Sequence, residues 1–125
     1  MLASTGRASR VVGPSETAAA VGSGDLPVFA TPVMIALMEA AACEALAGRL
    51  PEGSTSVGIQ VDVRHLAPTP VGATVTAFAE VVDVQGATVT FSVSASQDTG
   101  LGPVEIGSGT HVRAVVDRER FLARI

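Results

Sequence analysis

The clearest pattern of hydrophobic and polar positions is a long apolar stretch in the first half of the chain. Residues 33–50 are rich in Ala, Leu and Met, which favour a helix, and a Pro-Glu-Gly turn signal follows them. Thr31 and Pro32 precede this stretch, as an N-cap and a first helical residue would. Because the stretch is apolar nearly all round through Ala42, we expect a buried helix. Glu39 is the charged exception within it.

After this helix, apolar positions alternate with polar ones, which is typical of half-buried strands. We expect four strands, over residues 57–65, 74–84, 88–96 and 104–116. In the first of them the odd-numbered positions, which end at His65, share the apolar face, and the even-numbered positions from Gly58 share the other. A Gln-Gly pair predicts a tight turn between the second and third strands. Two glycines in the fourth strand, Gly107 and Gly109, indicate a bulge or a close backbone approach.

Shorter elements flank this region. Residues 10–12 can form a short strand and residues 16–21 a brief helix, and Asp117 can cap a final helix over residues 118–124. One buried helix followed by an antiparallel sheet is an α+β arrangement, and the length indicates a single domain over residues 1–125. The exposed edges of such a sheet favour dimerisation.

The composition excludes several classes of function. The chain has 125 residues, a net charge of -4, 3% aromatic residues, and eight basic residues that are all Arg. Without lysine, neither Schiff-base chemistry nor a Lys-bearing phosphate loop is available. The absence of a basic patch and of stacking aromatics argues against nucleic acid as a partner, and two His with one Cys are too few for a metal site. No apolar stretch is long enough for a membrane span, and the single Cys43 indicates a cytoplasmic protein.

Three polar residues stand out against the apolar background, namely Thr31, Glu39 and His65. A helix N-terminus offers free N–H groups to a carbonyl that gains negative charge, and a nearby carboxylate and imidazole can activate water or a nucleophile. At ~100° per residue, Glu39 lies about 80° round the helix from Thr31, so we expect both to face one pocket. Purely structural roles for all three stay open on the pattern alone. We interpret His111 as strand packing and Cys43 as a packed core residue.

These residues and their surroundings resemble the fluoroacetyl-CoA thioesterase-like family. The resemblance covers roughly residues 10–124 and rests on residues 28–31, 37–39 and 106–111 with His65 and Arg113. It implies a hotdog fold, in which an antiparallel sheet wraps around one long central helix. It also implies a homodimer whose active sites lie at the interface.

The resemblance implies an acyl-CoA thioesterase with a catalytic set of Thr31, Glu39 and His65. In this reading the helix N-terminus at Thr31 polarises the thioester carbonyl, Glu39 is the nucleophile or the base, and His65 positions water or protonates the leaving thiolate. Gly58 matches a glycine near the acyl pocket. Arg113 matches an arginine near the substrate, which meets the CoA phosphates or orders the pocket. No cofactor is implied, because CoA is part of the acyl-CoA substrate.

The sequence departs from that family at its aromatic gate for fluoroacetyl selectivity, where Asp25 and Leu26 stand. We therefore expect hydrolysis of a small or medium acyl-CoA and do not carry over the fluorinated substrate. Two alternatives are a non-enzymatic acyl-CoA-binding protein and an acyl-CoA hydratase on the same fold. The hydratase commonly pairs an Asp with a His five residues later, and here Gln60 and Ile106 hold the positions five residues before the two histidines.

Overall fold

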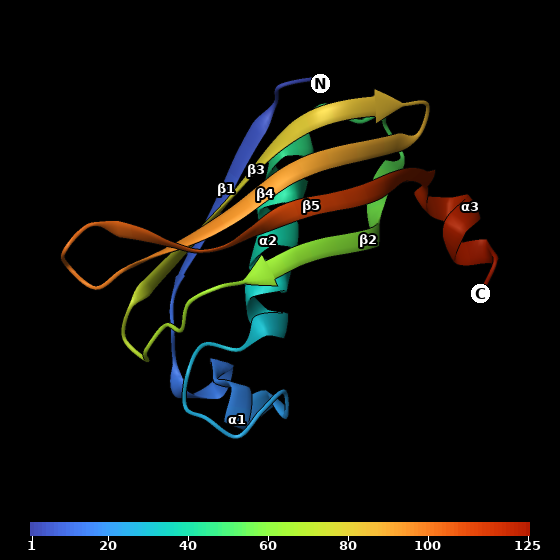
Figure 1. Ribbon diagram of the computed structural model, residues 1–125. Helices are drawn as coiled ribbons and strands as arrows, with labels where there is room; N and C mark the ends of the chain where they lie inside the picture. Colours follow the sequence, from blue (N-terminus) through green and yellow to red (C-terminus); the bar gives the residue numbers. More distant parts are fainter.

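A long helix packs against a curved antiparallel sheet in the computed structural model, which describes all 125 residues (Figure 1). The sheet has five strands in the order β1-β3-β4-β5-β2, and every neighbouring pair is antiparallel. The helix and strands are α2 (Thr31–Leu46), β1 (Thr5–Val11), β2 (Ser54–His65), β3 (Thr74–Gln85), β4 (Thr88–Asp98) and β5 (Pro103–Asp117). The predicted α+β arrangement of a sheet around one long helix is therefore confirmed, with β1 as a fifth strand longer than the short one expected.

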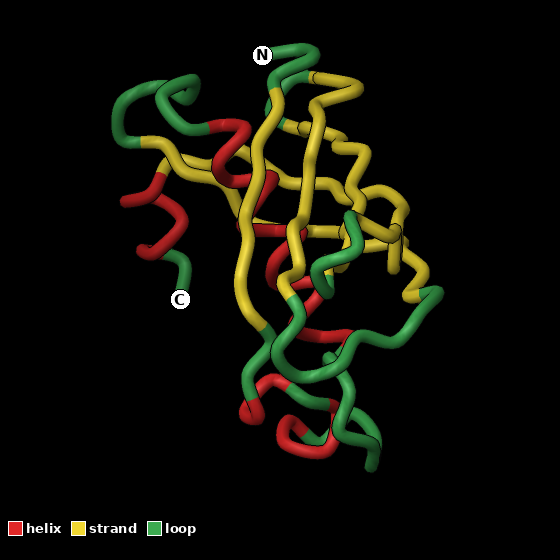
Figure 2. The backbone as a smooth tube through the Cα atoms, turned by 90° about the vertical axis from the view of Figure 1, so that its left-hand side faces the viewer, coloured by secondary structure: helices red, strands yellow, loops and turns green.

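Three short helical segments complete the chain: η1 (Pro14–Glu16), α1 (Ala18–Val21) and α3 (Arg118–Ala123). The brief helix expected over residues 16–21 is thus divided at Thr17, whose hydroxyl caps α1 by accepting from Ala20 N–H. The expected cap of the final helix is confirmed, because the Asp117 carboxylate accepts from Arg120 N–H at 2.9 Å. Figure 2 shows η1 and α1 below the sheet, near the start of α2. No helix in the fold combines the length and the apolar surface that crossing a membrane requires.

The core lies between one face of α2 and the concave side of the sheet. Met34, Met38 and Ala41 on α2 are buried against small side chains such as Ala77 and Ala79 on β3. Short side chains on both elements let the helix approach the sheet closely, which explains why an Ala- and Val-rich chain with few aromatics can build this core. The same packing fixes where the two ends of α2 lie relative to β2.

The prediction that α2 is buried all round is wrong within this chain. Pro32, Ala36, Ala40 and Cys43 are exposed on the side that faces away from the sheet. The physical reason is that one sheet covers one face of a helix, so the second apolar face has no partner within this chain. The expected packing of Cys43 is wrong for the same reason.

The prediction that β2 keeps one face along its whole length is also wrong. The ladder between β2 and β5 shifts register between Gly58 and Gln60. A Cβ built on Gly58 would collide with Glu39 on α2, so this even-numbered position faces the helix, while odd-numbered Val63 packs on the core. The extra residue at the bulge, Ile59, exchanges the two faces, as a β-bulge does.

The close approach expected in the last strand is confirmed. A Cβ on Gly107 would lie 2.7 Å from the Arg64 carbonyl oxygen and 2.8 Å from Met34 Sδ. The ladder between β4 and β5 also shifts register between Ala95 and Ser96, beside this glycine. Glycine at this position therefore lets β5 pass close to both β2 and α2.

Candidate active site

The first residue of α2 and the last residue of β2 meet through their side chains. Thr31 Oγ1 lies 2.8 Å from His65 Nδ1. The N-cap of α2 is Ala30, which has no side chain to cap with, so the prediction that Thr31 is the N-cap is wrong by one residue. A threonine at the N-cap would turn its hydroxyl back onto the helix N–H groups. At the first helical position, the Thr31 hydroxyl is directed to the imidazole instead.

The environment of His65 favours the neutral imidazole. Loss of solvent lowers the pKa of His65 below its ordinary value of 6.5, and the nearby Ala67 backbone opposes this only in part. Its Nε2 atom is buried and has no hydrogen-bond partner. A neutral ring that contacts the Thr31 hydroxyl through Nδ1 can exchange a proton with that hydroxyl.

The backbone at the start of α2 adds a free donor to this pair. The N–H groups of Val33 and Met34 both donate to the Ala30 carbonyl, at 3.1 and 3.0 Å, and Pro32 has no N–H. Thr31, as the first residue, has no acceptor within the helix. The Thr31 residue therefore presents a backbone N–H and a hydroxyl at the positive end of the helix dipole, which suits an oxygen that becomes negative.

Thr31 and His65 border a hollow of about 250 Å³. Its other walls include Phe29, Leu66 and Pro68, and five of its nine lining residues are hydrophobic. A small, largely apolar space beside a hydroxyl, an imidazole and a free N–H is the usual composition of a small-molecule site.

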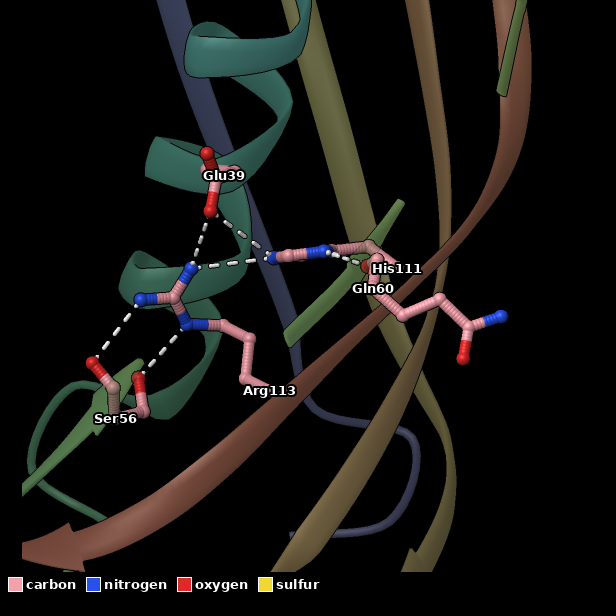
Figure 3. Close-up of polar contacts among 5 residues, drawn as sticks. All are labelled: Glu39, Ser56, Gln60, His111 and Arg113. Atoms are coloured by element: carbon pink, nitrogen blue, oxygen red, sulfur yellow. Dashed lines mark hydrogen bonds and ion pairs between the residues drawn. The ribbon is translucent and has the colours of Figure 1, made fainter. Parts of the chain in front are cut away.

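Glu39 lies in a second polar cluster, on the middle of α2 (Figure 3). Its Oε2 accepts a hydrogen bond from Arg113 Nη1 at 3.0 Å and lies 3.6 Å from His111 Nε2. Arg113 also donates from Nε to Ser56 Oγ at 2.8 Å and from Nη2 to the Ser56 carbonyl at 3.1 Å. Gly58 lies against the same cluster, where a Cβ would be 3.2 Å from His111 Cε1 and would overlap the Glu39 carboxylate.

The chain therefore brings the expected residues together in two groups rather than one. A step of eight residues along the helix separates Thr31 from Glu39, a rise of ~12 Å. The hollow beside Thr31 and His65 is not lined by Glu39, so the expected common pocket does not form within one chain. The Glu39 side chain is 38% exposed, whereas that of Arg113 is 8% exposed and bonded to its neighbours.

Sequence reasoning missed Ser56 and the polar role of His111. His111 does pack as expected, since it is 1% exposed and stacks on Phe91, but both of its ring nitrogens also contact polar atoms. One signal was available, because residues two apart on a strand share a face and His111 and Arg113 have that spacing. The contribution of Ser56 depends on the bulge in β2 and has no comparable signal.

Comparison with known proteins assigns the family. A family model described as fluoroacetyl-CoA-specific thioesterase matches residues 12–119. The chain belongs to this family. Among curated proteins, the fluoroacetyl-CoA thioesterase of Streptantibioticus cattleyicolor is 46% identical over 98 residues, which are 78% of this chain and 68% of that protein.

Solved structures agree with the membership in the fluoroacetyl-CoA-specific thioesterase family. The fluoroacetyl-CoA thioesterase FlK is 38% identical and superposes with a TM-score of 0.86, covering 99% of this chain and 93% of the other. A thioesterase superfamily member of Thermus thermophilus is 26% identical with a TM-score of 0.89, covering 99% and 89%. A hot-dog-like protein of Thermanaerovibrio acidaminovorans is 30% identical with a TM-score of 0.84, covering 98% and 88%. The predicted hotdog fold is confirmed.

Proposed function

We propose that this member of the family hydrolyses the thioester of a small or medium acyl-CoA to the free acid and CoA. The observation that carries the proposal is the Thr31–His65 pair at the N-terminus of α2, beside a small apolar hollow. Hydrolysis of a thioester passes through a tetrahedral species with a negative oxygen, and donors fixed in advance at that oxygen lower the barrier. The family membership and this donor arrangement support the same reaction.

Thr31 and His65 have separate roles in the proposed reaction. The thioester carbonyl oxygen accepts from the Thr31 N–H, from its hydroxyl, or from both. The imidazole of His65 lines the hollow and contacts the Thr31 hydroxyl through Nδ1, and in this proposal it orients water or gives a proton to the departing CoA thiolate. The lowered pKa of His65 keeps the resting ring neutral at pH 7, so it accepts a proton before it returns one.

Glu39 supplies the carboxylate that acts either as a base or as a nucleophile. As a base, its carboxylate takes a proton from water while the water oxygen bonds to the carbonyl carbon and the carbon–sulfur bond breaks. As a nucleophile, a Glu39 carboxylate oxygen bonds to the carbonyl carbon, the carbon–sulfur bond breaks and CoA leaves as the protonated thiol; water then opens the acyl-enzyme anhydride to the free acid and the Glu39 carboxylate. Arg113 serves either route by holding Oε2, which leaves Oε1 available.

A homodimer joined through β2 would bring the two groups together. β2 is an edge strand of the sheet, and both Gly58, beside Glu39, and His65 lie on it. Its exposed apolar residues, Ile59 and Val61, favour burial against another chain. An antiparallel pairing of two β2 strands centred between Val61 and Asp62 would set Gly58 of one protomer opposite the end of the other strand, where Thr31 and His65 meet.

The dimensions of the hollow support a short acyl group. The hollow of about 250 Å³ has room for a few carbon atoms beside the carbonyl. Asp25 and Leu26, where the family's aromatic gate would lie, are exposed and do not line the hollow. We therefore do not extend the fluorinated substrate of the relatives to this chain, and the proposed substrate is a small or medium acyl-CoA.

The test is release of free CoA thiol from a panel of acyl-CoAs, from acetyl to medium chain, with fluoroacetyl-CoA included. We expect turnover that is lost in Glu39→Gln. Tight binding in calorimetry without thiol release would favour the acyl-CoA-binding alternative, and water addition to an unsaturated acyl-CoA would favour the hydratase. Inactivity of the wild type on every member of the panel would refute the proposal.

A further inference from the structure

The second histidine of the chain, His111, occupies a buried position of the kind that a hydrocarbon side chain usually fills. His111 is 1% exposed, and its ring stacks on Phe91 with centroids 6.0 Å apart. A buried imidazole is costly unless its nitrogens are paired. Both are paired here, and neither partner is a backbone group of its own strand.

The partners determine where the proton of this ring lies. His111 Nδ1 is 2.8 Å from the Gln60 carbonyl oxygen, which can only accept, so Nδ1 carries the hydrogen. His111 Nε2 is 3.1 Å from Arg113 Nη1, which can only donate, so Nε2 must offer its lone pair. Glu39 Oε2, at 3.6 Å from Nε2, is beyond hydrogen-bond distance, so the two contacts together specify a neutral imidazole protonated on Nδ1.

This lone pair completes the set of contacts around the Arg113 guanidinium. Nε and Nη2 donate to the hydroxyl and carbonyl of Ser56, and Nη1 donates to both Glu39 Oε2 and His111 Nε2 (Figure 3). Each of the three guanidinium nitrogens of Arg113 therefore has a hydrogen-bond acceptor. Without His111, one N–H of Nη1 would have no acceptor, and the guanidinium would be free to tilt about its bonds to Ser56.

We propose that His111 is a positioning residue: its neutral Nδ1–H tautomer, set by the Gln60 carbonyl, fixes the Arg113 guanidinium that orients the Glu39 carboxylate. The inference rests on the proposed thioesterase function, in which Glu39 acts on the acyl-CoA. His111 itself touches no substrate in this arrangement. It acts on the position of Glu39 Oε2 through its hydrogen bond with Arg113 Nη1.

The bulge in β2 contributes to the same arrangement of Glu39, Arg113 and His111. Gln60 follows the register shift directly, and its carbonyl reaches a side chain of β5. Gly58, on the other side of the shift, leaves the space that the Glu39 carboxylate and the His111 ring occupy. The bulge therefore makes room for the Glu39 carboxylate and also supplies the carbonyl that sets the tautomer of His111.

The first test reads the tautomer directly and needs no activity. Long-range ¹H–¹⁵N correlation of the imidazoles at pH 7.5 is simple here, because the chain has two histidines. We expect one ring with the shifts of a neutral Nδ1–H tautomer, and we expect that signal to disappear in His111→Gln. An Nε2–H tautomer or a doubly protonated ring at His111 would overturn the proposal, whether or not any acyl-CoA is hydrolysed.

The second test separates positioning from packing. His111→Asn keeps a donor near Nδ1 but offers no acceptor at the Nε2 position, whereas His111→Gln can place its amide oxygen there. We expect His111→Asn to lower kcat about tenfold or more with KM nearly unchanged, and His111→Gln to recover most of the loss, because small displacements of a reacting group are costly. The control is Thr110→Val, which is isosteric and exposed on the neighbouring position.

The outcomes distinguish the two proposals. Equal kcat in His111→Asn and wild type, or equal losses in His111→Asn and His111→Gln that follow their Tm values, would overturn the positioning role while the thioesterase assignment stands. A wild-type protein that releases no thiol would refute the thioesterase assignment, and the tautomer measurement would still decide the arrangement of His111 and Arg113.

Discussion

Thr31 Oγ1 and His65 Nδ1 form a 2.8 Å hydrogen bond between residues 34 positions apart in the sequence. The contact joins the first residue of α2 to the last residue of β2. It places a hydroxyl, an imidazole and the free N–H of a helix N-terminus around one small hollow. The proposed thioester hydrolysis depends on this contact.

Loss of the Thr31 hydroxyl should impair turnover without unfolding the protein. Thr31→Val keeps the shape of the side chain and removes the partner of His65, so we expect kcat to fall by about 10²-fold, the lower range for a group engaged in proton transfer. Thr31→Ser, which keeps the hydroxyl, should retain most of the activity. Steady-state thiol release with a matched Tm measurement checks this, and full activity in Thr31→Val would contradict it.

The pH profile should report His65. Because burial lowers the pKa of His65, the neutral ring persists below pH 6.5, and kcat/KM should stay high until the pH falls through that lowered pKa. The same shift favours the folded state above pH 6.5, and this contribution is lost as the pH falls further, since the unfolded chain takes up the proton first. His65→Gln should remove this acid limb from both the residual activity and the stability profile. An acid limb at or above pH 6.5 in the wild type would be inconsistent with this role.

Arg113 should act on Glu39 rather than on the CoA phosphates. Arg113→Lys keeps the charge but cannot bond to Ser56, His111 and Glu39 together, so we expect kcat to fall by about tenfold or more. The loss should be the same for an acyl-CoA and for the matching acyl-pantetheine, which lacks the nucleotide. A loss confined to the acyl-CoA, expressed in KM, would assign Arg113 to the phosphates instead.

A methyl group at Gly58 should displace the carboxylate at little cost in stability. In Gly58→Ala the added Cβ would collide with Glu39 Oε2, the end of a flexible side chain that can move away. We expect kcat to fall by about tenfold, as for other small displacements of a reacting group, with a small change in Tm. Gly13→Ala is the control, because its Cβ would lie at an ordinary 3.6 Å from Glu16 Oε1. Equal kcat in Gly58→Ala and wild type would show that Glu39 need not occupy this position.

Mixed dimers should reveal whether a site uses both protomers. In the proposed homodimer, Thr31→Val alone is expected to keep about a hundredth of the wild-type kcat and Glu39→Gln alone to be inactive. If Thr31 and His65 of one protomer work with Glu39 of the other, subunit exchange in an equal mixture should restore about a quarter of the wild-type sites, because one site of each mixed dimer is intact. No recovery, with exchange verified by mass spectrometry, would mean that each site is built within one protomer.

The sequence by itself determined the elements and the candidate residues. The apolar stretch before Pro51 and the alternation after it specify one helix and long strands, since these periodicities are local properties of the chain. Thr31, Glu39 and His65 could be singled out because polar groups are costly in such apolar surroundings. The resemblance to a thioesterase family rested on the same positions, and the family and the fold are confirmed.

Only the tertiary structure decided which of these residues meet. Arg113 and Glu39 are 74 positions apart, and their contact depends on the register between β2 and β5 and on the bulge at Ile59. One extra residue exchanges the two faces of a strand, and the alternation of side chains gives no sign of where it is inserted. The contact of the His111 ring with the Gln60 carbonyl depends on the same register, and the exposed second face of α2 follows from how the sheet covers only one side of the helix, which no local pattern records.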